Sequence, residues 1–207
     1  AEAEAALGYL YPPDVRRLLA RARGIDGLLE EVDFTGLAEG QALDELFPRV
    51  ATVATDGYGN GWVVDLLREN GAWGPIWYLS HDPPVALHQC NGLATFLDEL
   101  VRMHTPPHAS LIDDVHDDRL FRVGRTHPGS LDAEDAAGSD DPELAAFAAE
   151  LGAGWTIVDV RDASPGLGIA WGRFGPRTEL RRHGASQLFA LRAPARRWFR
   201  RSGGDRR

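Results

Sequence analysis

The residues with the clearest capacity for chemistry lie close together between positions 104 and 118. They are His104, His108, Asp113, Asp114, His116, Asp117 and Asp118. Imidazole and carboxylate groups bind zinc and harder cations, so this 104–118 cluster could support a metal-dependent hydrolase. However, Pro106 and Pro107 break the helix that would place His104 and His108 on one face. The aspartates equally fit a solvated loop, and we expect no bound metal and no cofactor.

A second group of reactive side chains comprises His81, Asp82, His88 and Cys90. A Cys–His nucleophile pair needs a third group to orient it and a pocket for the oxyanion. The sequence around Cys90 indicates neither. We interpret these residues as loop polar groups beside a buried thiol and expect no catalytic residue.

Residues 56–61 read Asp-Gly-Tyr-Gly-Asn-Gly. A glycine-rich loop that binds phosphate leads into the N-terminus of a helix, whereas this one lies between two expected strands. Glycine tolerates the positive φ angles of tight turns. We therefore predict a turn, with Asp56 and Asp65 as turn and strand-edge residues rather than acid–base groups.

The elements expected around this turn form a helix, a three-stranded meander and a second helix. They are a helix from Tyr11 to a cap at Gly24, strands over residues 50–55, 62–67 and 75–80, a loop from His81 to Gly92, and a helix with apolar positions from Leu93 to Val101. Turns this short join only antiparallel strands. The pattern predicts an α+β fold in which helices flank an antiparallel sheet.

The second half of the chain is expected to begin with a loop or linker over residues 105–140, since this stretch is rich in Pro, Asp and Gly. Asp141 and Pro142 are typical of a helix start. The further predictions are a helix to Leu151, strands 155–160 and 167–171 paired across the turn Ser164–Gly166, and a hairpin of residues 179–182 and 187–191. We assign residues 1–104 to a core, 141–193 to an extension that could pack on it, and 194–207 to a flexible basic tail.

Charge is distributed unevenly along the chain, which has a formal net charge of −9. Residues 161–207 carry 12 arginines and three acidic residues, a net of +9, whereas residues 1–160 carry 10 arginines and 28 acidic residues, a net of −18. An acidic surface attracts basic proteins and repels nucleic acid. The basic tail could touch nucleic acid or anionic lipid, but we favour a tail that offsets the acidic body.

The sequence shows no feature that would direct the chain to a membrane or to an oxidising compartment. Cys90 is the one cysteine, so no internal disulfide can form. The acidic start of the chain lacks the basic region of a signal peptide, and no apolar run approaches the roughly 20 residues needed to cross a bilayer. We expect a cytoplasmic protein without membrane contact.

Several segments together resemble the SUKH superfamily, which includes the SMI/KNR cell-wall regulators of yeast and bacterial relatives. They are Leu10–Leu19, Phe47-Pro48, Val53–Gly57, Gly59–Trp62, Val64–Leu66, Pro75–Asp82 and Leu93–Leu100. The resemblance covers roughly residues 7–104. The opening helix departs most from the pattern, and the chain after His104 matches nothing in it.

The resemblance implies an antiparallel sheet flanked by helices and a role as an immunity protein that neutralises a bacterial toxin. Such toxins are often basic nucleases, which suits the acidic body. Alternatives are an interaction scaffold of the SMI/KNR type and the hydrolase considered above. Aromatic hot spots and acidic groups suggest the partner contacts Trp73, Trp77, Tyr78, His81, Asp82, Asp113, Asp114, Asp117 and Asp118. Because side chains alternate along a strand, we expect about half of these aromatics to be core.

Overall fold

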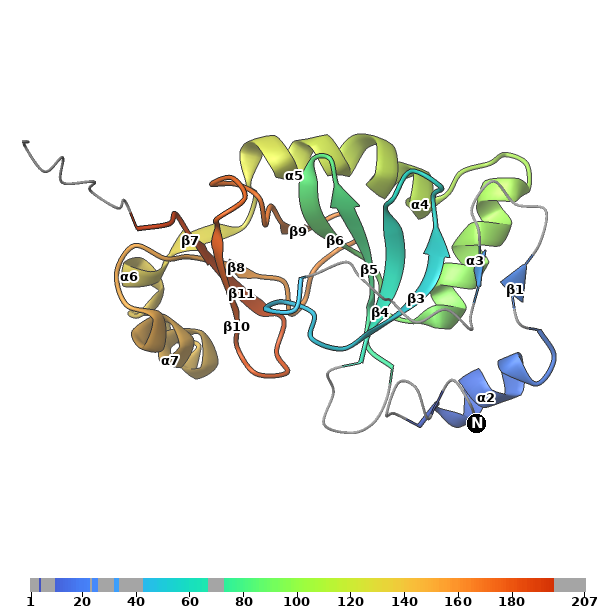
Figure 1. Ribbon diagram of the computed structural model, residues 1–207, viewed down its shortest axis with the longest axis horizontal. Coiled ribbons are helices and arrows are strands. Elements are labelled where there is room, and N and C mark those ends of the chain that lie inside the picture. The colour runs from blue at the N-terminus through green and yellow to red at the C-terminus, as the bar shows by residue number, and fades with distance from the viewer. Residues whose placement is uncertain are drawn as a thin grey trace, which may run out of the picture.

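The structure is a computed structural model that describes residue 4 and residues 10–22, 24–25, 32–33, 43–66 and 73–195 of the 207-residue chain. In these residues the predicted α+β class is confirmed, with antiparallel pairing in every sheet. The main body has four layers: helices, a five-stranded sheet, a four-stranded sheet and helices again (Figure 1).

The five-stranded sheet has the order β3-β4-β5-β6-β9. Its strands are β3 (Val50–Thr55), β4 (Gly61–Asp65), β5 (Ile76–His81), β6 (Pro84–Cys90) and β9 (Gly168–Ile169). The predicted meander is confirmed by β3, β4 and β5. Gly168 permits the last pairing, since a Cβ there would collide with the backbone of Ala86.

Helices cover one face of this sheet. They are α3 (Leu93–His104), α4 (Leu111–Asp113), the π-helix η1 (Asp114–Arg119) and α5 (Leu120–Thr126). Phe96 and Leu100 of α3 pack in one cluster with Ile112 of α4, Val115 of η1 and the apolar residues of the sheet. This helical layer carries one wall of the site described below.

The opposite face of the five-stranded sheet packs on the four-stranded sheet, whose order is β10-β11-β8-β7. Its strands are β7 (Ser130–Asp132), β8 (Thr156–Asp159), β10 (Glu179–Arg182) and β11 (Leu188–Arg192). Trp77 and Phe189 meet between the sheets with ring centroids 5.6 Å apart. Because β5 is covered on both faces, it is buried along almost its whole length.

The outer face of the four-stranded sheet is covered by α6 (Ala133–Ala136) and α7 (Pro142–Leu151). Asp141 caps α7 by accepting hydrogen bonds from the N–H groups of Glu143 and Leu144, as its position before Pro142 predicts. The remaining elements are α2 (Pro13–Leu19), β1 (Gly24–Ile25) and β2 (Val32–Asp33). Gly24 therefore lies in a strand and does not cap the first helix.

The predicted loop over residues 105–140 is wrong, because α4, η1, α5, β7 and α6 occupy much of it. The buried positions Ile112, Val115, Leu120 and Val123 are three, five and three residues apart. The π-helix adds a residue to the turn between Val115 and Leu120. That step breaks the regular helical spacing and hides the amphipathic pattern.

Two further pairings differ from expectation. The predicted loop from His81 to Gly92 contains β6, which begins at Pro84 and buries the polar residues His88 and Gln89. The turn at Ser164–Gly166 forms, since the N–H of Leu167 donates to the Ser164 carbonyl, but its flanking strands do not pair with each other. β8 pairs in one sheet and β9 in the other, so this turn connects two layers.

The hairpin of residues 179–182 and 187–191 is confirmed as β10 and β11. Val158, Val160, Phe189 and Leu191 of the predicted extension pack in the cluster that contains Trp77. The predicted tail of residues 194–207 lies outside the described residues apart from residues 194–195.

Candidate functional site

The turn between β3 and β4 is organised by the carboxylate of Asp56. Its Oδ1 accepts the N–H groups of Tyr58 at 2.8 Å and Asn60 at 3.2 Å, while its Oδ2 accepts Asn60 Nδ2 at 2.7 Å and the Tyr78 hydroxyl at 2.9 Å. Gly57 and Gly59 have φ angles of 75° and 88°, the conformation that favours glycine. The predicted turn is confirmed, and Asp56 stabilises it.

Protonation in this turn is set by burial and hydrogen bonding. Burial of Asp56 is the largest single influence and opposes ionisation, but the hydrogen bonds from Asn60, Tyr58 and Tyr78 together outweigh it and lower the pKa of Asp56. Burial, followed by the contact with Asp56, raises the pKa of Tyr78 far above its ordinary value. At neutral pH the pair is therefore a carboxylate that accepts a hydrogen bond from a neutral phenol.

A buried polar network positions the helix opposite this turn. Gln89 accepts a hydrogen bond from Trp62 Nε1 at 3.1 Å and donates to the Leu111 carbonyl at 3.1 Å. Glu99 accepts the N–H of Leu111 at 2.7 Å, and the Ser110 side chain caps α4 at Ile112. These contacts link the start of α4 to both β6 and α3.

The π-helix η1 brings His116 to the turn. Its Nε2 lies 3.6 Å from Asp56 Oδ2, and its Nδ1 lies 3.0 Å from Asp117 Oδ1. The His116 ring is edge-on to Tyr78 at 5.4 Å and nearly parallel to Trp62 at 6.5 Å between centroids. π-Helical turns are rare and frequently mark functional sites.

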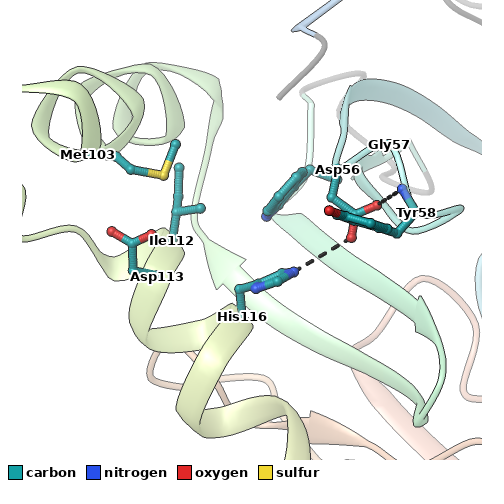
Figure 2. A pocket seen from close by; sticks show the side chains of 8 residues that line it. Asp56, Gly57, Tyr58, Met103, Ile112, Asp113 and His116 are labelled. Carbon is teal, nitrogen blue, oxygen red and sulfur yellow. Dashed lines mark hydrogen bonds and ion pairs between the residues drawn. The ribbon is translucent and has the colours of Figure 1, made fainter. Parts of the chain in front are cut away.

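A pocket of about 460 Å³ lies between the turn and the helical layer. Its lining residues are Asp56, Gly57, Tyr58, Trp62, Met103, Ile112, Asp113 and His116. Figure 2 shows Met103, Ile112 and Asp113 facing Asp56, Gly57 and Tyr58 across the hollow, with His116 beside it. The pocket thus combines carboxylates, aromatic rings and apolar side chains.

The aromatic residues predicted as partner contacts do not line this pocket. Trp77 and Tyr78 are 0% exposed, so they are core residues rather than surface contacts. Strand alternation places them on opposite faces of β5, and both faces are covered. Trp73 is half-buried and packs edge-on against Tyr11 at 5.5 Å.

The predicted polar contacts lie nearer the site. His81 donates its N–H to Asn60 Oδ1 at 3.1 Å, and its Nδ1 lies 2.7 Å from the same oxygen, so the exposed turn carrying His81 and Asp82 adjoins the Asp56 turn. Asp113 lines the pocket itself. Asp114, Asp117 and Asp118 are exposed on η1.

The groups considered for catalysis and metal binding are dispersed. In the residues that the structure describes, no three His, Cys, Asp or Glu side chains could together hold a metal ion. His104 ends α3, and His108 contacts the Met103 carbonyl at 2.9 Å. His88 lies edge-on to Trp77, whereas Cys90 belongs to the cluster beneath α3, and burial raises the pKa of Cys90 to about 11.

Several pocket residues were not predicted from the sequence as a site. Asp56 was expected as turn structure, which it is, but its contact with His116 joins residues 60 positions apart. The aromatic Tyr58 within the glycine-rich turn was a usable signal, because binding residues concentrate on loops and tyrosine is enriched at interfaces. Nothing in the sequence marks Met103 and Ile112 as opposite walls of one pocket.

Comparisons of the chain with models of known protein families, with curated proteins and with solved structures find no match. Among the described residues, no helix is long and apolar enough to cross a membrane. The resemblance to the SUKH superfamily rests on its sequence motifs and stays a prediction.

Proposed function

We propose that the chain is a non-enzymatic binding protein that neutralises a basic protein toxin, as its resemblance to SUKH immunity proteins implies. The observation that carries the proposal is the acidic run on η1, the element that brings His116 to the pocket, together with an exposed aromatic ring on the turn that lines the pocket. Asp114, Asp117 and Asp118 are exposed along η1, and the Tyr58 side chain is 82% exposed on the facing turn. Tyrosine anchors with charged surroundings are common in protein interfaces.

The protonation pattern supports binding over acid–base chemistry. Both ring nitrogens of His116 face carboxylate oxygens, so neither is directed at a substrate. The hydrogen bonds that Asp56 accepts from Tyr58 and Asn60 stabilise its own turn, and the one that it accepts from Tyr78 comes from a hydroxyl that its raised pKa keeps protonated. A general base must instead reach the proton that it removes.

Charge complementarity supports a basic partner. The −18 of residues 1–160 includes the acidic run on η1, and charges of this kind accelerate encounter with an oppositely charged protein. Nucleases carry basic surfaces because their substrates are polyanions. A basic nuclease domain therefore fits the proposal.

Co-expression tests this function. The protein encoded by the gene next to this chain's gene is expressed in a bacterial host with or without the chain, and growth is measured. We expect the chain to restore growth. The triple change of Asp114, Asp117 and Asp118 to Asn should weaken binding to the toxin domain by about tenfold or more, because each removes an interfacial charge.

The matched control changes Glu134, Asp135 and Asp140 to Gln or Asn, which removes the same charge from exposed positions around α6. This variant should protect as well as the wild type. Wild-type chain that gives no protection would overturn the immunity function. Equal loss in both triple variants would show that overall charge, rather than the acidic run on η1, governs binding.

A further inference from the structure

We infer that the pocket receives a single arginine side chain from the partner. The inference rests on the proposed function, which requires a basic partner, and adds which side chain enters and where. A hollow of about 460 Å³ is large enough to enclose one side chain of a docked protein. Interface hot spots commonly consist of such an anchor in a desolvated pocket.

The charges of the pocket favour a cation. Its lining contains the carboxylates of Asp56 and Asp113, and none of its eight residues in the described part of the chain is arginine. The lowered pKa of Asp56 keeps that group ionised at neutral pH. Carboxylates in a partly enclosed hollow attract cations more strongly than the same groups do on an open surface.

The uncharged walls favour a flat cation with an apolar stem. Tyr58 provides an exposed aromatic ring, and Met103 together with the buried Trp62 and Ile112 provides apolar contact. A guanidinium group stacks on aromatic faces and pairs with a carboxylate, while its methylene stem packs against apolar side chains. A lysine ammonium lacks the flat face, and an apolar guest would bury carboxylates without compensation.

The pocket walls are already positioned for such a guest. The hydrogen bond from Trp62 to Gln89 fixes the indole, and the Asp56 hydrogen bonds fix the turn that carries Tyr58. Tyr58 itself is 82% exposed, so its ring can cover a bound guanidinium without breaking a packed contact. Preorganised walls reduce the entropy cost of binding.

A pair of peptides tests this inference on the full chain. Acetyl-Gly-Arg-Gly-amide is compared with the same peptide carrying citrulline, which keeps the shape of arginine but has no charge. We expect the arginine peptide to shift the NMR signals of the Trp62 indole and of the Gly57, Tyr58 and His116 amides in a saturable manner. The citrulline peptide should leave these signals almost unchanged.

Two single variants locate the binding. Asp113→Asn should weaken binding of the arginine peptide about fivefold, as expected for loss of one partly exposed ion pair. Glu134→Gln removes the same charge from an exposed position on α6, an element that contributes no residue to the pocket, so binding should be unchanged. If Asp113→Asn fails to fold, the comparison of the arginine and citrulline peptides on the wild-type chain decides whether the pocket binds arginine.

The outcomes separate this inference from the proposed function. Equal shifts from both peptides, no shifts from either, or equal weakening by the two variants would overturn the arginine pocket. Growth rescue without arginine binding would leave the immunity function standing and remove the pocket assignment. Arginine binding without growth rescue would leave the pocket assignment standing and remove the immunity function.

Discussion

At the scale of single residues, Asp56 is the side chain on which the pocket most depends. Its two oxygens accept the hydrogen bonds that hold the β3–β4 turn, and one of them also faces His116. Hydrogen bonds to a charged acceptor are stronger than neutral ones, and a buried carboxylate is retained only when it is well paired. The turn therefore stabilises the charge, and the charge stabilises the turn.

Asp56→Asn tests this mutual dependence. We expect the free energy of unfolding to fall by about 2 kcal/mol at neutral pH, because the amide cannot accept all the hydrogen bonds of the carboxylate. The pKa of Asp56 is lower in the folded state, so its contribution is complete above the ordinary pKa and is lost as pH falls through the folded value. The difference from wild type should narrow below about pH 4.

The measurement is urea unfolding, followed by tryptophan fluorescence across this pH range. Asp114→Asn is the control, since Asp114 is exposed and should change stability little at any pH. A difference that widens as the solution is acidified would contradict the assigned direction of the Asp56 pKa.

Residue types alone predicted the turn between β3 and β4. They did not distinguish exposed aromatic residues from buried ones. Asp56, Gly57 and Gly59 have local roles, and local roles can be inferred from adjacent residues. Trp77 and Tyr78 carry the aromatic character of an interface, but β5 is central in its sheet and covered on both faces. The burial of Trp77 depends on Val158, Val160, Phe189 and Leu191, which lie more than 80 residues later in the chain.

At the scale of elements, the π-helix explains both a failure of prediction and the geometry of the site. The five-residue step from Val115 to Leu120 conceals the helix from a search for regular spacing. The same irregularity lies where His116 contacts Asp56. The interruption of local regularity coincides with the pocket, as expected for functional positions.

β6 was missed for a different reason. Two prolines precede its apolar residues, and the polar His88 and Gln89 interrupt the pattern of a buried strand. These polar side chains are accommodated because Asn91 pairs with His88 and because Gln89 connects Trp62 to Leu111. The two hydrogen bonds of Gln89 reach residues 27 and 22 positions away and leave no trace in local composition.

Gln89→Leu should weaken the attachment of α4 to β4 and β6, which Gln89 connects through its hydrogen bonds. The change leaves the buried indole N–H of Trp62 and the Leu111 carbonyl without their partner, which we expect to cost about 2 kcal/mol of stability. Amide hydrogen exchange should also accelerate in residues 112–115, because the start of α4 is no longer attached to β6. Gln187→Leu, at a half-buried position before β11, provides the matched control. Unchanged exchange in α4 would contradict the positioning role of Gln89.

At the scale of the whole molecule, the chain joins two sheets whose strands come from distant parts of the sequence. β9 adds to the sheet built mainly by residues 50–90, and the apolar layer between the sheets combines Phe47 and Trp77 with Phe189. The α+β class could be predicted because turns and helix starts are local. The stacking of the two sheets could not be predicted, because it depends on which buried strands of one sheet face those of the other.

A buried ion pair connects these two parts. Arg182 Nη2 lies 2.7 Å from Asp65 Oδ2, and the two side chains are 3% and 1% exposed. Arg182 also donates to the Leu46 carbonyl at 2.9 Å and lies over the ring of Phe189 at 5.4 Å. One guanidinium therefore contacts the end of β4, the segment before β3 and the core of the four-stranded sheet.

Removal of either member of this pair should destabilise both sheets together. We expect Arg182→Met to lower the free energy of unfolding by about 3–5 kcal/mol, because Asp65 stays buried without its cationic partner. The double change Asp65→Leu with Arg182→Met should be less destabilised than Arg182→Met alone, since no buried charge of the pair then remains. Arg177→Met, at an exposed position before β10, should be nearly neutral. Urea unfolding of the wild type, Asp65→Leu, Arg182→Met and the double variant gives the coupling. If the double variant is as unstable as the sum of the single variants, the pair is not coupled, and apolar packing alone joins the two sheets.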